Sequence, residues 1–172
     1  MTEIIRLTPD DVARYRDIRL EALRTEPDAF GSTFETEAEY PLAAFASRLA
    51  ECAVFGAVNG DELAGVAGFY VQAGPKHAHK GVLWGMFVRP AYRDTRLGRR
   101  LVEAVIEHAR QHVELLQLTV IADNVAARRL YQRLGFVEYG IERDAAKYRG
   151  RYHDDVLMAL AFKTGTPEEP TR

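Results

Sequence analysis

A cluster of arginines leads into a helix in the stretch Val88 to Leu101, which reads VRPAYRDTRLGRRL. The first amides of a helix have no acceptors within the helix and carry partial positive charge, so they favour an anion. Gly98 lets the backbone approach such an anion closely, and guanidinium groups add charge that suits phosphates. The spacing therefore predicts a phosphate-binding turn with four arginines, Arg93, Arg96, Arg99 and Arg100.

A plainer interpretation of this turn also stands: a solvated helix start whose arginines pair with Glu103 and its neighbours. Two familiar phosphate-binding motifs are excluded. No Gly-Lys-Ser/Thr follows the turn, as a nucleotide-binding P-loop requires, and the G-x-G-x-x-G of dinucleotide-binding folds is absent.

The second stretch whose side chains could take part in a reaction is DNVAARRLYQRLGF, which contains Asn124 and Tyr131. Seven residues separate them, close to two helical turns, so both side chains share one face about 10 Å apart along the axis. Asn124 alone would be an N-cap, and Tyr131 alone a half-buried aromatic. A phenol can also give a proton to a leaving group when its surroundings suit, so general acid chemistry is the functional alternative.

These two stretches need strands and helices to position them. Alternating and continuous apolar runs predict a β-α-α-β-β-β-α-β-α-β-β order, which implies an α/β mixed sheet with helices on both faces. Gly85 is expected to mark a bulge in the strand before the basic turn. We expect strands over 3–7, 53–58, 62–72, 80–88, 115–122, 136–143 and 152–162, the last two joined by a polar loop, and helices over 9–26, 32–50 (broken at Pro41), 97–112 and 125–134.

Length and composition indicate one compact domain. The chain has 172 residues, and we expect a single domain over residues 1–163 and a disordered tail over 164–172. The formal net charge of −2 argues against a nucleic-acid partner. A single cysteine, Cys52, and the absence of a leader-like or membrane-length apolar segment favour a cytoplasmic protein without a membrane partner.

Taken together, the two motifs resemble those of the GNAT superfamily of N-acetyltransferases. Val88-Arg89-Pro90 matches the turn after the family's fourth strand, and Arg93 to Gly98 occupies the place of its pyrophosphate loop, Arg/Gln-x-x-Gly-x-Gly/Ala. The family's N-x-x-A-x-x-L-Y-x-x-x-G-F element is matched at Asn124, Ala127, Leu130, Tyr131, Gly135 and Phe136. The resemblance covers about Ile4 to Phe162 and implies a mostly antiparallel sheet of six to seven strands.

The resemblance also implies roles. Acetyl-CoA would be the acetyl donor, a primary amine the acceptor, and the reaction a direct attack in a ternary complex without metal. Backbone groups of Met86 to Val88 would pair with pantetheine where strands splay apart, and Tyr131 would protonate the leaving thiolate. The expected donor-binding residues are Met86, Phe87, Val88, Arg93, Asp94, Thr95, Arg96, Leu97, Gly98, Arg99, Asn124, Arg128 and Tyr131.

The chain departs from the family pattern at two points. Arg96 stands where the first loop glycine is expected, and a right-handed helical backbone would accommodate its side chain. Neither expected strand 80–88 nor 115–122 carries a carboxylate, which leaves the general base open among Glu35, Glu37, His79 and Asp154 acting through water. The lack of a carboxylate on these strands favours a second hypothesis, in which the chain is a non-catalytic acyl-CoA-binding module.

Other groups of residues are weaker candidates for a functional site. His77 with His79, or His108 with His112, could ligate a metal, but solvated histidines are commoner and no metal is expected. Cys52 is expected to be a core thiol. The acceptor is expected to lie between Ser32–Tyr40 and Gly140–Tyr152, where charges of both signs suit an amino-acid-like acceptor or a peptide terminus. Whether two copies form a homodimer stays open.

Overall fold

The structure is a computed structural model that describes residues 2–162. The expected disorder of residues 164–172 lies outside the described residues. Seven strands form one sheet in the order β1-β2-β3-β4-β5-β7-β6, in which β4 and β5 are parallel and the other neighbours antiparallel. The elements are β1 (Glu3–Arg6), η1 (Pro9–Asp11), α1 (Val12–Thr25), η2 (Pro27–Ala29), α2 (Phe34–Ala38), α3 (Leu42–Glu51), β2 (Ala53–Asn59), β3 (Glu62–Val71), β4 (Lys80–Val88), η3 (Pro90–Tyr92), α4 (Leu97–Arg110), β5 (Leu115–Ile121), α5 (Val125–Arg133), β6 (Val137–Tyr148) and β7 (Arg151–Ala161).

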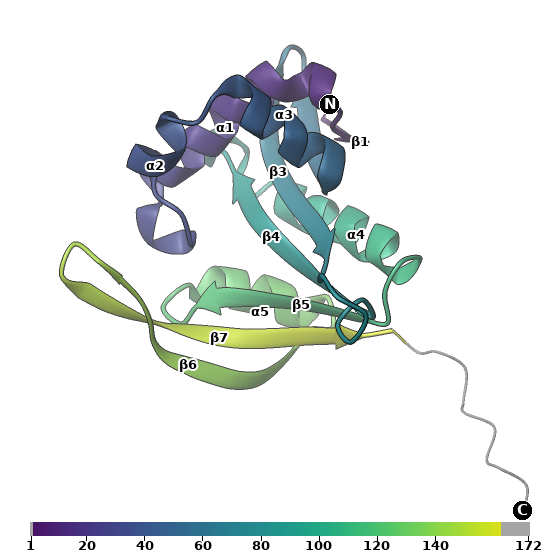
Figure 1. The fold of residues 1–172 in the computed structure, drawn as a ribbon, viewed down its shortest axis with the longest axis vertical. Helices are drawn as coiled ribbons and strands as arrows, with labels where there is room; N and C mark the ends of the chain where they lie inside the picture. Colours follow the sequence, from purple (N-terminus) through teal and green to yellow (C-terminus); the bar gives the residue numbers. More distant parts are fainter. Residues whose placement is uncertain (1, 163–172) are drawn as a thin grey trace, which may run out of the picture.

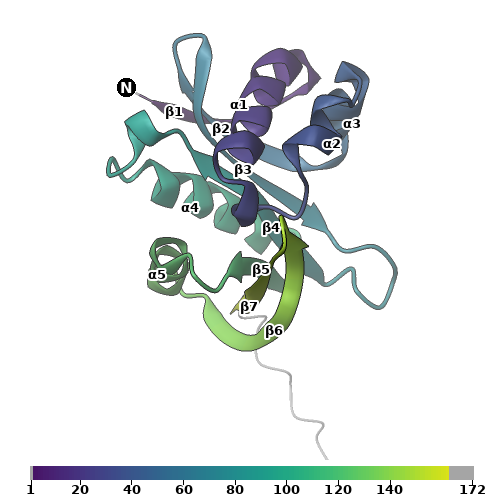
Figure 2. The ribbon, with the colours of Figure 1, turned by 90° about the vertical axis from the view of Figure 1, so that its left-hand side faces the viewer.

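Helices cover both faces of the sheet, as expected (Figures 1 and 2). α4 and α5 lie on one face, where apolar residues at helical spacing on α4, among them Leu101 and Val105, are fully buried against the strands. α1 and α3 pack on the opposite face, and Tyr15 and Phe45 meet there edge to face with ring centroids 6.3 Å apart. Of the helices in residues 2–162, none has the length and apolar character needed to cross a membrane.

The start of α1 follows from local chemistry. Thr8 and Asp11 form a capping box around Pro9, and the backbone N–H of Thr8 donates to the Asp11 carboxylate at 2.8 Å. The first turn is a 3₁₀ helix, and α1 then runs to Thr25, where Pro27 ends it. The capping box and Pro27 therefore fix where this helix begins and ends along the chain.

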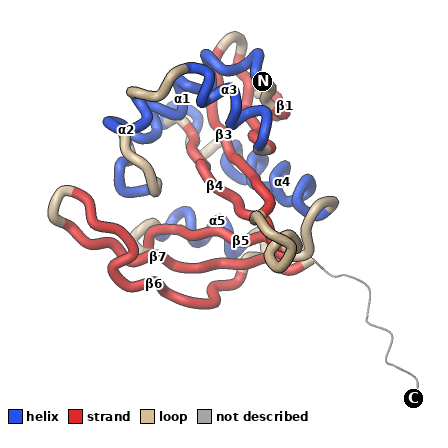
Figure 3. The backbone as a smooth tube through the Cα atoms, in the orientation of Figure 1, coloured by secondary structure: helices blue, strands red, loops and turns tan. Residues whose placement is uncertain are grey.

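One expected loop is wrong. The polar segment Asp144 to Gly150 was expected to connect two short strands, but β6 continues to Tyr148 and β7 begins at Arg151 (Figure 3). A bulge at Asp144, whose φ is 50°, interrupts the alternation of residue types along the strand. The sequence pattern therefore does not show that the strand continues. Asp154 on β7 stabilises this bulge, since its carboxylate accepts the Asp144 N–H at 2.9 Å and the Arg143 guanidinium at 2.7 Å.

Candidate active site

The sheet splits between β4 and β5. The two strands pair only over Lys80–Val82 with Leu115–Gln117 and then diverge, as the sequence led us to expect. Gly85 contributes to the divergence because it lies in a bulge, where Gly85 and Met86 stand opposite the single residue Ala67. Its φ of 63° suits glycine, so the expected bulge at Gly85 is confirmed.

The split opens into a cleft of about 720 Å³. The cleft brings together the C-terminal half of β4, the basic turn before α4, and one face of α5 from its N-cap to its C-terminal end. Gly98 lies on its wall, where an added Cβ would stand only 3.1 Å from the Cε atom of Met86. Ten of the thirteen expected donor-binding residues line this cleft: Met86, Phe87, Val88, Arg93, Asp94, Arg96, Leu97, Gly98, Arg99 and Asn124.

The other three expected residues are placed differently. Thr95 lies in the same turn, and its hydroxyl donates to the Tyr92 carbonyl. Arg128 is absent from the lining of the cleft, because its guanidinium binds the Ala122 carbonyl at 2.9 Å and pairs with Glu138 at 2.9 Å. Arg128 thus joins α5 to the neighbouring loop and to β6. Tyr131 does not line the cleft but lines a smaller cavity beside it.

The backbone of Arg96 contradicts the expectation. Its φ and ψ are 63° and 9°, so it adopts the left-handed region and not the right-handed helical one. Asp94 shares this φ of 63°. A left-handed conformation costs an ordinary residue about 1–2 kcal/mol relative to a right-handed one. The turn therefore keeps a geometry that favours glycine, although an arginine occupies it.

Three arginine side chains of the turn bind other groups of the protein. Arg99 pairs with Glu103 at 2.7 Å, which is the contact that the plainer interpretation expects. Arg100 donates to the hydroxyl and the carbonyl of Thr2, each at 3.1 Å. Arg93 donates from Nε to the Val88 carbonyl at 3.0 Å and forms an ion pair with Glu26. Sequence reasoning missed Glu26, because no motif links the end of α1 to this turn.

Asn124 caps α5, as its plainer interpretation expects. Its side-chain oxygen accepts the Ala127 N–H at 3.2 Å, and the residue still lines the cleft. Asn124 therefore both caps α5 and lines the cleft.

Tyr131 lines a smaller inner cavity of about 100 Å³ at the base of the split. Tyr131 is 6% exposed, and its ring meets the Phe136 ring edge to face at a centroid distance of 5.7 Å. Burial raises the pKa of Tyr131, so its hydroxyl keeps its proton at neutral pH. Four residues, Glu26, Met86, Asn124 and Ala127, line both the cleft and the inner cavity, so the two spaces adjoin.

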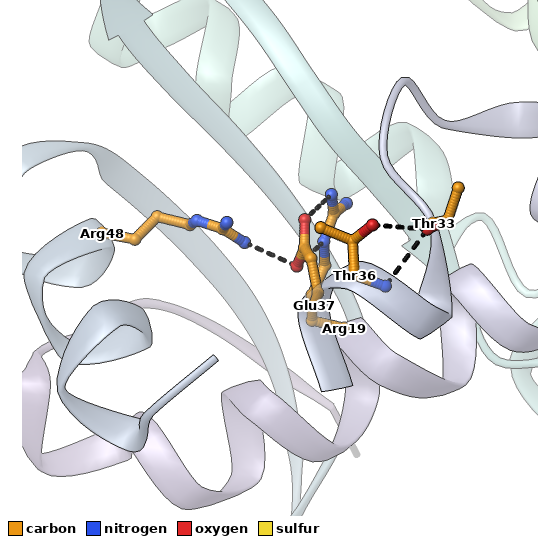
Figure 4. Close-up of polar contacts among 5 residues, drawn as sticks. All are labelled: Arg19, Thr33, Thr36, Glu37 and Arg48. Carbon is orange, nitrogen blue, oxygen red and sulfur yellow. Dashed lines mark hydrogen bonds and ion pairs between the residues drawn. The ribbon is translucent and has the colours of Figure 1, made fainter. Parts of the chain in front are cut away.

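None of the four suggested bases lines the cleft or the inner cavity. Glu37 is 2% exposed and binds two guanidinium groups: Arg19 at 2.9 and 3.0 Å and Arg48 at 3.1 Å (Figure 4). Burial alone would raise the pKa of Glu37, but these two arginines outweigh it and lower the pKa from 4.5 to about 2.

The other three suggested bases also lie elsewhere. Glu35 approaches Arg149 at 3.9 Å, Asp154 stabilises the β6 bulge, and His79 is exposed before β4. The rival histidines His108 and His112 stack with ring centroids 4.2 Å apart, and residues 2–162 contain no cluster of three His, Cys, Asp or Glu side chains arranged for a metal.

Comparison with known proteins identifies the family and the fold. Residues 17–136 match the acetyltransferase (GNAT) family. The chain belongs to the GNAT family. The GNAT acetyltransferase from Streptococcus pneumoniae superposes with a TM-score of 0.84 over 95% of this chain and 100% of that one, at 24% identity. An acetyltransferase from Salmonella typhimurium, solved with acetyl-CoA, gives 0.80 over 99% of each chain at 20% identity. Both structures establish the shared GNAT fold.

A curated relative is similar over a shorter stretch. The ribosomal protein bS18 alanine N-acetyltransferase of Escherichia coli strain K12 is 37% identical over 82 residues. That stretch is 47% of this GNAT chain and 55% of the relative, so the chain spans about half the length of the curated relatives it matches.

Proposed function

We propose that this protein transfers an acetyl group from acetyl-CoA to a primary amine by direct attack in a ternary complex. The observation that carries the proposal is the cleft itself, because it joins the free edge of β4, the basic turn and the start of α5 beside a buried, protonated tyrosine. Membership of the GNAT family supports acetyl-CoA as the donor.

Each part of the site has a proposed task. The backbone groups of Met86 to Val88 pair with the pantetheine arm, and the amides of Asp94 to Arg99 hold the pyrophosphate. Asn124 contacts pantetheine from the opposite wall. An amide of the Gly85 bulge donates to the thioester oxygen as charge builds on it, which lowers the barrier to attack.

Tyr131 completes the proposed reaction. The amine nitrogen attacks the thioester carbon, the C–S bond breaks, and the sulfur leaves as a thiolate. Tyr131 gives its proton to that thiolate and recovers one from the amide nitrogen. The donor to the departing sulfur must carry its proton at neutral pH, and the Tyr131 hydroxyl does, since burial only raises its pKa further.

A donor-binding experiment and a turnover experiment test the proposal. Saturating acetyl-CoA should raise the melting temperature, because a ligand that binds only the folded state stabilises it. Thiol release should then rise when a panel of amines is added. No shift at millimolar acetyl-CoA or CoA would remove the donor assignment.

The second candidate is an acyl-CoA-binding module without turnover. The absence of any carboxylate on β4 and β5 favours it, and the retained Tyr131 opposes it. A clear melting shift without thiol release for any amine would favour this candidate.

The name of the curated relative indicates which amines to test as acceptors. Its name gives an alanine of ribosomal protein bS18 as acceptor, so alanine-terminated peptides belong in the panel beside free amino acids and polyamines. We propose that residues 1–163 act as one domain and that the reaction takes place in the cytoplasm. Sedimentation of the purified protein distinguishes a monomer from a homodimer.

A further inference from the structure

No sequence motif predicts a role for Glu26, yet its position in the fold suggests one. It follows the last turn of α1, its backbone N–H donates to the Ala22 carbonyl at 2.9 Å, and Pro27 comes next, so its backbone is well fixed. Its side chain is 34% exposed and lies on the walls of both the donor cleft and the inner cavity. Among the residues that line these two spaces, the carboxylates are Glu26 and Asp94, and Asp94 lines the cleft alone.

Arg93 pairs with that carboxylate in the structure. Its side chain folds back from the basic turn over the Phe87 ring, 5.7 Å from the ring centroid, and its Nε atom donates to the Val88 carbonyl at 3.0 Å. Its Nη2 atom then pairs with Glu26. One arginine therefore binds a backbone group of the β4 edge, where the donor arm is proposed to pair, and the carboxylate that faces the inner cavity.

Two charged groups compete for Arg93 once a donor enters. The pyrophosphate carries more negative charge than one carboxylate and brings several acceptor oxygens, so it attracts a guanidinium strongly. An exposed ion pair contributes little stability, so the Glu26–Arg93 contact can exchange at small cost. Movement of Arg93 towards the phosphates would free both the Val88 carbonyl and the Glu26 carboxylate.

We propose that Glu26 is the carboxylate that binds the acceptor's ammonium group, and that Arg93 holds Glu26 until acetyl-CoA draws Arg93 away. This inference rests on the proposed acetyl transfer. It makes donor binding the event that prepares the acceptor site, so the acceptor binds second. It also supplies the base that β4 and β5 lack.

The protons balance in this scheme. The ammonium group gives one proton to Glu26, and the neutral amine attacks the thioester carbon. The C–S bond breaks, and the sulfur takes the proton of Tyr131. The new amide nitrogen then gives its second surplus proton to the tyrosinate. Glu26 returns its proton to solvent when the product leaves.

The surroundings of Glu26 narrow the class of acceptor. Most other residues that line the inner cavity have apolar side chains, and Glu26 is its one charged lining residue within the described chain. A cationic amine on a small apolar carbon, such as the amino end of an alanine-terminated peptide, matches a single carboxylate with no second charged group beside it. An acceptor whose amine lies beside a carboxylate would place two negative charges in this space.

Glu26→Gln tests the inference, because the two halves of the proposal predict opposite effects. Removing the pair frees Arg93, so acetyl-CoA should bind about two- to fivefold tighter by calorimetry. Turnover of an alanine-terminated hexapeptide should fall about a hundredfold, since both the ammonium partner and the base are lost. A purely structural role would weaken both. Glu21→Gln is the matched control: it breaks the Glu21–Arg89 pair (2.8 Å) nearby, Glu21 lines neither space, and both measurements should stay unchanged.

A double-mutant cycle separates the exchange of Arg93 from a simple loss of negative charge. In an Arg93→Ala background, Glu26→Gln should no longer tighten acetyl-CoA binding. Tightening that persists without Arg93, or Glu26→Gln that turns over the peptide normally, would overturn the inference. If the unmodified protein neither binds acetyl-CoA nor releases thiol, the proposed function itself fails, and that outcome is distinct from either of these.

Discussion

The backbone of the basic turn is unusual at single residues. Asp94 and Arg96 both have a φ of 63°, a region that glycine enters at no steric cost and other residues enter at a cost. The turn holds this geometry because Leu97, directly after it, is buried under the sheet and fixes the start of α4. Residues held in costly backbone conformations cluster at functional sites, which supports the proposed role of this turn in binding.

Replacing Arg96 separates strain from charge. Arg96→Gly should exceed Arg96→Ala in free energy of unfolding by about 1 kcal/mol, because only glycine relieves the left-handed backbone. Urea denaturation measures both variants. Equal stabilities would show that the turn relaxes when the arginine is removed.

The same two variants report on the guanidinium group. Both should weaken acetyl-CoA by about two- to fivefold at low ionic strength, and the loss should shrink as salt screens the phosphates. Calorimetry at two salt concentrations measures this. If Arg96→Gly bound the donor more tightly at both, the side chain would be a steric obstacle.

Tyr131 offers a sharper residue-scale prediction. Tyr131→Phe removes only the hydroxyl, so kcat should fall about a hundredfold while the Kd of acetyl-CoA changes little. Single-turnover measurements isolate the chemical step from product release. An unchanged single-turnover rate would exclude the hydroxyl from proton transfer.

At the scale of elements, one ion cluster joins three helices. Arg19 of α1, Glu37 of α2 and Arg48 of α3 meet in a largely buried contact, and both arginines lie over the Trp84 ring, at 5.5 and 5.3 Å. Removing the carboxylate would leave two guanidinium groups facing each other. Glu37→Gln should therefore cost about 3 kcal/mol of unfolding free energy, whereas Glu35→Gln, at an exposed pair, should cost little.

The cluster also sets a pH dependence. The pKa of Glu37 is lowered in the folded state to about 2, against 4.5 as the reference value. Its contribution to stability is thus complete above about pH 4.5 and is lost as the pH falls from there towards 2. Acid titration of the folded protein should show this loss, and Glu37→Gln should be less sensitive to pH in that window. A variant as pH-sensitive as the unmodified protein would contradict the assignment.

The β6–β7 hairpin reaches α2 and η2 at its tip. Arg149 approaches Glu35 at 3.9 Å, and His153 approaches Asp28 at 3.4 Å. We propose that these segments shape acceptor choice. Exchanging the charges with Glu35→Lys and Arg149→Glu keeps the pair attractive, so stability should hold while KM for charged acceptors shifts about fivefold. Acceptor kinetics with cationic and anionic amines measure it; identical preferences would exclude this surface.

Sequence patterns predicted the elements better than the conformations between them. Helical spacing placed α4 and α5 within two residues, because burial of one face dictates both. The extension of β6 was missed, since a bulge and charged residues remove its alternation. Glu26 could not be found, because only tertiary folding brings the end of α1 to the basic turn. Left-handed Arg96 was missed because the sequence signals that conformation only through glycine.

At the scale of the whole molecule, the sheet consists of two halves that share only three residue pairs between β4 and β5. β1 to β4 carry α1 and α3, while β5 to β7 carry α5, and α4 packs against the first half (Figure 1). The donor cleft and the inner cavity exist because these halves diverge. Their size is therefore a property of the fold and not of any one loop.

We therefore expect the inner cavity to limit the length of the acyl chain. The volume of about 100 Å³ is small, so we expect it to hold a methyl group and an attacking nitrogen more readily than a long chain. Hexanoyl-CoA should bind as acetyl-CoA does through its nucleotide yet react about tenfold more slowly or worse. Phe30 lines this space, so Phe30→Ala should recover part of the hexanoyl rate. Equal rates for both thioesters would mean that the halves of the sheet can separate further, and the protein would then be an acyltransferase of broad chain length.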